Sequence, residues 1–438
     1  MKRLPKLLFT SVMSLAAFPA LTMGADLLSL YQKAENYDAD IFAAKSAYLA
    51  EREGESIAFS KLLPSINASA SIEHTDSNFK GSPDDSYITE TYTVALSQPL
   101  INFSSWYKVT AAEQNTLQAE TTYLAAQQNL ILEISSAYFG VLRTEENLRS
   151  AKSQEAAVKR QYEQAKEQFD VGLIAITDVH EAKASYDASQ TLRIRSEGDL
   201  TIARENLSRI TGEYSTELAT LKSDFPITMD KNTSAEQWAE SAFQNNLNIK
   251  IAEFALNSVK ADYKASKSGH YPTLNLEAGY RNNDFSNNRS NDTDQTNTNI
   301  ALTLNVPLYS GGATQASVRQ KRHLIEQASQ QLTSAQRQAK IETRTEYINL
   351  KTNIQTVESL QQNIISRQSA LEATREGYNV GTRNIVEVLD AERNYFTALR
   401  DYANARFDFV ESNLRIKRSA GTLNKADIEA LNKWLESR

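Results

Sequence analysis

Residues 377–391 read GYNVGTRNIVEVLDA, and residues 168–182 read QFDVGLIAITDVHEA. Both stretches contain a Val-Gly pair, and four residues after the glycine both begin the pattern Ile-x-x-Val-x-x-Ala. Glycine readily takes the left-handed conformation that ends many helices, and apolar residues at every third or fourth position indicate a helix face. Each stretch therefore predicts a helix end, a tight turn (about 172–177 and 381–385) and a returning helix. Residues of the cap type begin the returning helices, Thr177 with Asp178 in the first and Asn384 in the second.

The chain repeats itself outward from these two stretches. Leu63-Pro64-Ser65-Ile66-Asn67 matches Tyr271-Pro272-Thr273-Leu274-Asn275, and Gln98-Pro99-Leu100 matches Val306-Pro307-Leu308. The offset between matching positions stays at 208 or 209. We therefore predict a tandem duplication with repeats at 25–230 and 231–438, each made of a helix, a β-hairpin, a long helix, a tight turn and a helix, and the second followed by a short tail.

Long helices are predicted from the placement of proline and from heptad spacing. No proline lies between Pro99 and Pro226 or after Pro307, and proline is the residue that interrupts helices most strongly. Apolar residues also recur every seven positions, at Leu350, Val357, Ile364, Leu371 and Tyr378. Such heptads indicate helices packed at shallow angles, as in coiled coils. A helix from about Trp106 to Val171 would be about 100 Å long at ~1.5 Å per residue, although periodicity alone fits a fibrous coiled coil as well.

Strands are predicted in the ranges of about 64–103 and about 272–308, where the apolar period changes to two. Apolar side chains alternate with mostly polar ones in four runs, which indicate four strands in two hairpins. The apolar members of the runs are Ile66, Ala68, Ala70, Ile72; Tyr92, Val94, Leu96; Leu274, Leu276, Ala278, Tyr280; and Ile300, Leu302, Leu304, Val306.

The first 24 residues have the features of a secretory signal peptide. Lys2, Arg3 and Lys6 precede a mostly apolar run, and small residues at Thr22 and Gly24 fit a cleavage site before Ala25. We therefore expect residues 1–24 to be removed on export. No later apolar run is long enough for a transmembrane helix.

Composition argues against several classes of function. The net charge is −7 and becomes more negative without residues 1–24, so the chain lacks the positive field that nucleic-acid binding requires. There is no cysteine, and the four histidines (His74, His180, His270 and His323) have no ligand spacing, so we expect no metal site. No nucleophile–base pattern or Gly-rich phosphate loop suggests an enzyme or a cofactor.

Four strands per chain predict an oligomer. A four-stranded sheet cannot close into a barrel, and open sheet edges are not stable in lipid. Three copies would supply 12 strands, enough for a water-filled pore, and would place their long helices in a ring. We therefore expect a mainly α protein with membrane β-structure, in which a trimeric α-barrel tunnel of coiled-coil helices continues a 12-stranded β-barrel.

Over nearly all of residues 25–438, this plan resembles the TolC family of outer-membrane efflux and secretion channels. The closest local matches are 171–179, 377–391 and the Gly-Thr-Leu-Asn run at 421–424. The resemblance implies a homotrimer in the outer membrane of a Gram-negative cell, extending into the periplasm. It also implies an exit duct for drugs, toxic small molecules or proteins, closed until a periplasmic adaptor and an inner-membrane transporter of the RND, ABC or MFS type engage it.

The resemblance also implies a periplasmic gate. Glu387 and Asp390 would form two carboxylate rings in the narrow end of the tunnel, and such rings favour cations. Tyr378 and Arg383 would tie the inner helical pair to the outer pair, with acceptors on Thr177 and Asp178.

The two glycine turns are the expected docking points for the adaptor. They comprise Val171, Gly172, Leu173, Val380, Gly381 and Thr382. The main alternative is a periplasmic coiled-coil adaptor or structural protein, and migration as a heat-sensitive trimer in detergent would separate a channel from it.

Overall fold

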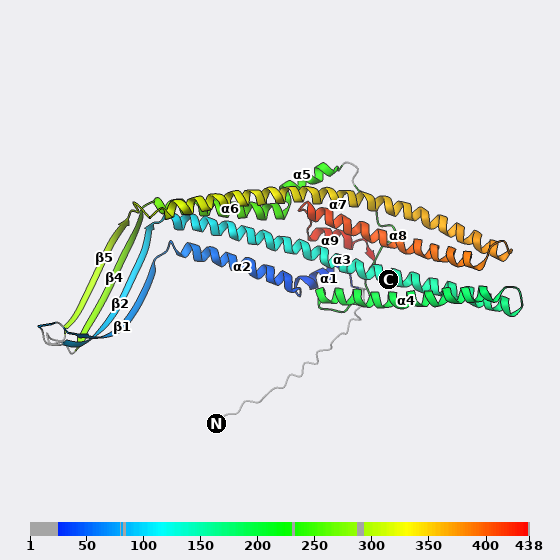
Figure 1. Ribbon diagram of the computed structural model, residues 1–438, viewed down its shortest axis with the longest axis horizontal. Coiled ribbons are helices and arrows are strands. Elements are labelled where there is room, and N and C mark those ends of the chain that lie inside the picture. Colours follow the sequence, from blue (N-terminus) through cyan, green and yellow to red (C-terminus); the bar gives the residue numbers. More distant parts are fainter. Residues whose placement is uncertain (1–24, 79, 82–84, 230–232, 287–292, 437–438) are drawn as a thin grey trace, which may run out of the picture.

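The computed structural model describes residues 25–78, 80–81, 85–229, 233–286 and 293–436, and the expected signal peptide lies outside these ranges. The described chain is elongated, with a sheet at one end and helical turns at the other (Figure 1). Two very long helices, α3 (Phe103–Asp170) and α7 (Ala313–Asn379), run from the sheet to the turns. The sequence predicted both, because no proline interrupts either segment.

Shorter helices flank the two long ones. On the sheet side, α2 (Ala39–Ser60) packs on α3, and α6 (Leu247–Lys267) packs on both α3 and α7. Beyond the turns, α4 (Ile176–Thr211) returns along α3, and α8 (Ile385–Ser419) returns along α7. The tips of the α3/α4 and α7/α8 hairpins lie at the same end of the molecule (Figure 1).

Each half begins with two helices, whereas the sequence pattern predicted one. In the first half α1 (Leu27–Glu35) precedes α2, and in the second half α5 (Ala235–Asn245) precedes α6. The break arises from an N-cap, because the Asp38 side chain accepts hydrogen bonds from the backbone N–H groups of Asp40 and Ile41. Asn246, 208 positions later, caps α6 through the N–H groups of Asn248 and Ile249.

The main sheet has four antiparallel strands in the order β1-β2-β4-β5. They are β1 (Ser65–Ser77), β2 (Asp85–Ile101), β4 (Thr273–Ser286) and β5 (Thr293–Asn305). The β2–β4 pairing joins the two hairpins in a register that sets Ala68, Val94 and Tyr280 side by side. Because the period is two, the predicted apolar residues of the four strands share one face, except Val306, which lies just after β5.

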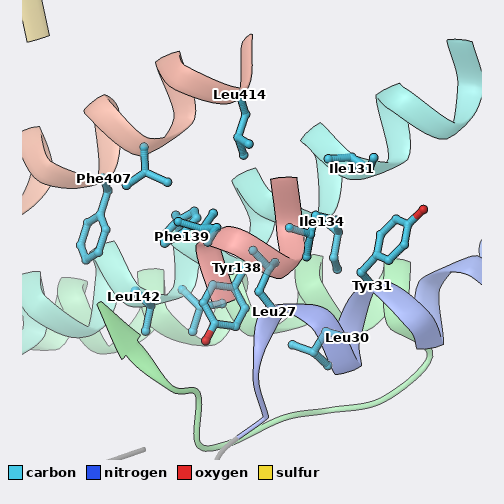
Figure 2. Close-up of a cluster of buried hydrophobic side chains, with 14 of the residues drawn as sticks. Leu27, Leu30, Tyr31, Ile131, Ile134, Tyr138, Phe139, Leu142, Phe407 and Leu414 are labelled. Carbon is cyan, nitrogen blue, oxygen red and sulfur yellow. The ribbon is translucent and has the colours of Figure 1, made fainter. Parts of the chain in front are cut away.

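The largest apolar core lies midway along the helices, where α1, α3 and α8 meet (Figure 2). Tyr138 and Phe139 of α3 are completely buried there, and the Tyr138 hydroxyl donates a 2.6 Å hydrogen bond to the carbonyl oxygen of Ala219. Two segments that the sequence pattern did not predict complete this region. They are α9 (Lys425–Asn432) and a small sheet of β3 (Thr220–Leu221) with β6 (Leu435–Glu436). A short 3₁₀ helix, η1 (Ser268–His270), leads from α6 into β4.

Within the described ranges, no helix combines the length and the apolar character needed to cross a membrane.

Candidate gate and docking region at the helical tips

The two glycine turns have the same backbone hydrogen bonds. After α3, the N–H of Gly172 donates to the carbonyl of Phe169, and the N–H of Leu173 donates to that of Gln168. After α7, Gly381 and Thr382 make the equivalent bonds to Tyr378 and Gly377. The φ angles of Gly172 and Gly381 are 79° and 77°, so both turns are Schellman caps with a left-handed glycine.

The apolar side chains beside these glycines face solvent. Val171, Leu173 and Val380 are 70%, 74% and 73% exposed. A Cβ atom on Gly172 or Gly381 would meet nothing within 4 Å, so backbone conformation, and not lack of space, favours glycine. The tips therefore present small, accessible apolar surfaces.

The two returning helices begin differently. Asn384 is the N-cap of α8, and its side chain accepts a hydrogen bond from the backbone N–H of Glu387, as the sequence predicted. The N-cap of α4 is Ala175, which has no side-chain acceptor. Thr177 and Asp178 lie within the first turn of α4, so the prediction that they begin this helix as capping residues is wrong.

The two hairpins meet in a small apolar cluster near their tips. Its buried members come from α3, α4 and α8, and Tyr378 of α7 packs against them. The buried members are Val158, Ala165, Ala182, Ile385 and Leu389. Burial raises the pKa of the Tyr378 hydroxyl above its usual value, and the charge of Asp178 raises it further. The hydroxyl therefore keeps its proton and remains a donor.

The acceptor for Tyr378 differs from the one expected. Its hydroxyl donates a 2.7 Å hydrogen bond to Oε1 of Gln168 on α3. Arg383, in the turn before α8, pairs with Glu387 of α8, with 2.5 Å between Nη1 and Oε2. No hydrogen bond within the described ranges joins either residue to Thr177 or Asp178. The structure thus brings Tyr378 to the outer hairpin through a residue that the sequence did not indicate.

Both candidate constriction carboxylates are paired with arginine. In addition to the Arg383–Glu387 pair, Nη2 of Arg393 lies 2.5 Å from Oδ1 of Asp390. All four side chains lie at the exposed surface of α8 or the turn before it, with exposed fractions of 37% to 63%.

An ion pair with a buried carboxylate and a half-exposed arginine lies one turn further along α8. Oε1 of the completely buried Glu392 is 2.5 Å from Nη2 of Arg375 on α7, whereas its Oε2 has no hydrogen-bond partner. Both residues line a cavity of about 330 Å³ that also touches Gln161 and Gln164 of α3. The pair links α7 to α8 at the level of the apolar cluster.

A protein-family model matches this chain twice, over residues 30–213 and 238–422, and its description is outer membrane efflux protein. The chain belongs to this family. The two matched segments cover most of the chain and correspond to its two similar halves. As a member of the family, this efflux protein is an outer-membrane channel for efflux and secretion.

Individual relatives agree with the family. The efflux protein is 35% identical to the outer membrane protein TolC of Vibrio cholerae over 434 residues, which are 98% of each chain. It is 27% identical to the proteases secretion protein PrtF of Dickeya chrysanthemi, over 98% of this chain and 95% of PrtF. The crystal structure of the Campylobacter jejuni CmeC outer membrane channel has the same fold, with a TM-score of 0.78 at 16% identity over 100% of this chain and 98% of CmeC. These names describe channel and secretion proteins and not enzymes.

Sequence reasoning missed three charged residues at the tips of this efflux protein. Glu392 continues the helical spacing of the buried residues Ile385, Val388 and Leu389 of α8. A carboxylate at a position where this spacing predicts an apolar residue was the signal in the sequence. Arg375 carried no sequence signal of its own. The signal for Arg393 was its spacing of three residues from Asp390, which places the two side chains together on a helix.

Proposed function

We propose that three copies of this chain form one channel, with 12 strands closing a barrel in the outer membrane and the long helices forming a tunnel in the periplasm. The four-stranded sheet is the observation that carries this proposal. Its apolar face is open, with Ile66, Ile72, Ile300 and Leu302 between 66% and 77% exposed. A face of this kind is suited to lipid.

The edges of the sheet support the assembly. Strands β1 and β5 are at the two ends of the strand order, so each has one side without a partner strand in this sheet. Unpaired backbone groups are costly in lipid, and pairing β5 of one copy with β1 of the next satisfies them. At 13 residues each, β1 and β5 are long enough to cross a bilayer, which takes about 9–11 tilted residues.

The tips of the hairpins supply a gate in this proposal. Glu387 and Asp390 of three copies surround the narrow end of the tunnel, and Tyr378 holds α7 against α3 through Gln168. A further tie from Arg383 to Thr177 and Asp178 remains a prediction. Contact with a partner protein breaks these hydrogen bonds and ion pairs between the two hairpins. The α7/α8 hairpin is then free to move, and the tunnel opens.

The glycine turns are the proposed docking points for a periplasmic adaptor. Exposed Val171, Leu173 and Val380 beside small Gly172 and Gly381 allow another helix tip to approach closely. The adaptor connects the channel to an inner-membrane transporter of the RND, ABC or MFS type.

The cargo is drugs, toxic small molecules or proteins, and the chain itself catalyses no reaction and binds no nucleic acid. The alternative of a coiled-coil adaptor gives no role to the open apolar face of the sheet.

Reconstitution tests the proposal. The purified protein should migrate in detergent as a heat-sensitive trimer and give discrete current steps in a planar bilayer. Leu302→Asp places a charge on the apolar face and should reduce insertion strongly, since a charged side chain on the lipid face is unfavourable, by less for aspartate than the about 2–4 kcal/mol that arginine or lysine costs at the midplane. Thr303→Asp, on the other face of the same strand, is the matched control. A protein that stays monomeric and gives no steps, or equal insertion by both variants, contradicts the proposal.

A further inference from the structure

Three ion pairs at the start of α8 bring together acidic residues of α8 and arginines from α7, the preceding turn and α8 itself. Glu387 is paired with Arg383, and Asp390 is paired with Arg393. The neighbouring Arg375–Glu392 pair adds no net charge, and its carboxylate is completely buried. A carboxylate constriction alone favours cations, so the arginines change what this segment does to a passing ion.

We propose that Arg393, together with Arg383, neutralises the carboxylates of the constriction, so that this gate discriminates little between cations and anions. The proposal rests on the proposed function, in which α8 lines the narrow end of the tunnel. Three copies then bring six carboxylates and six guanidinium groups to one constriction, which has no net charge.

The neutralisation does not depend on the ion pairs staying closed. Exposed pairs contribute only ~0–1 kcal/mol, and Arg393 is 63% exposed, so its side chain opens and re-forms the contact freely. Arg393 nevertheless starts three residues from Asp390, a rise of about 4.5 Å along the helix. This separation is below the screening length of about 8 Å at physiological ionic strength, so an ion in the pore experiences both charges together.

In this proposal Arg393 sets the charge selectivity of the channel. Removing the charge of either Arg393 or Asp390 leaves a ring of three charges of the other residue without their counter-charges. Loss of Arg393 gives the constriction three negative charges in the trimer, and loss of the Asp390 charge gives it three positive charges. The two changes act with opposite sign and cancel when combined. A role of Arg393 in stability alone predicts no such reversal.

Reversal potentials in a KCl gradient across a planar bilayer test the proposal, with trimer formation checked for each variant. Arg393→Gln should raise the cation-to-anion permeability ratio several-fold, Asp390→Asn should lower it several-fold, and the double variant should return close to the unmodified protein. Lys183→Gln is the matched control, because Lys183 forms a similar exposed pair with Asp187 on α4. It should leave the ratio unchanged.

The outcomes separate this proposal from the proposed function. If Asp390→Asn changes the permeability ratio and Arg393→Gln does not, the Asp390 carboxylate still lies at the constriction, but the role of Arg393 is overturned. Open channels whose selectivity responds to neither change overturn the placement of α8 at the constriction, and the proposal with it. Strong cation selectivity of the unmodified protein, equal to that of Arg393→Gln, also overturns the role of Arg393.

Discussion

The hydroxyl of Tyr378 on α7 donates a 2.7 Å hydrogen bond to Oε1 of Gln168 on α3. This bond connects two residues 210 positions apart in the chain, one at the end of each long helix. It joins the two helical hairpins at their tips, next to the apolar cluster that packs between them. Any movement of the α7/α8 hairpin away from α3 must break it.

Tyr378→Phe should therefore increase the time that the channel spends open. A neutral hydrogen bond contributes about 0.5–1.5 kcal/mol, and 1.4 kcal/mol is a factor of ten in an equilibrium constant, so losing one in each of three copies shifts the balance toward opening substantially. The measurement is mean conductance in a planar bilayer. Gln168→Ala should give a similar increase, and combining the two should add little because they remove one bond. Tyr162→Phe is the control within the same cluster, and an equal increase with that variant would count against the tie.

Gly381→Leu should abolish efflux in cells while the trimer still forms. The positive φ of Gly381 is strained for any other residue by about 1–2 kcal/mol, but the space around it is open, so the helices need not separate. The bulky side chain instead blocks the approach of a partner to the tip. Drug susceptibility and detergent-stable trimer are measured together. Gly198→Ala is the control, because Gly198 lies inside α4 with open space and no positive φ. Unimpaired export by Gly381→Leu would exclude docking at this turn.

The general plan of the fold is predictable from the sequence because it depends on local periodicity. The two Val-Gly turns, the proline-free segments and the period-two runs each determine their own conformation through neighbouring residues. The caps at Asp38 and Asn246 carry a local signal of the same kind, since the two residues match at the repeat offset, and they explain the additional helix break in each half.

The partners of the gate residues are not predictable in the same way. Whether Tyr378 contacts Gln168 or Asp178 depends on how α3 and α7 are rotated and shifted against each other, and periodicity does not specify this. Arg383, in the turn before α8, had candidate acceptors both on α4 and on α8. In the structure it contacts Glu387 of α8, which is only four residues away in the chain.

We expect the two partners of the Arg375–Glu392 ion pair to differ in how much stability their removal costs. Arg375→Met leaves the fully buried Glu392 carboxylate without its cation, which should cost about 3–5 kcal/mol of stability. Glu392→Leu leaves Arg375, which is 41% exposed and can turn to water, so the cost should be about 1 kcal/mol. Urea denaturation of the detergent-solubilised protein measures both. The double variant should be close to Glu392→Leu alone, and equal losses from the two single changes would contradict this account.

Stability should also depend on pH through Glu411 of α8. Burial raises the pKa of its carboxyl above the usual 4.5, Arg143 and Arg415 oppose this shift, and Asp408 reinforces it. Between 4.5 and the raised pKa, the folded chain holds a proton that the unfolded chain has released, so stability falls as pH rises through that window. Glu411→Gln cannot titrate and should flatten this part of the profile, measured as urea midpoints from pH 4 to about pH 8. Glu236→Gln, which removes an exposed partner of Arg344, should keep the slope of the unmodified protein. A slope that Glu411→Gln leaves unchanged would assign the pH dependence to other groups.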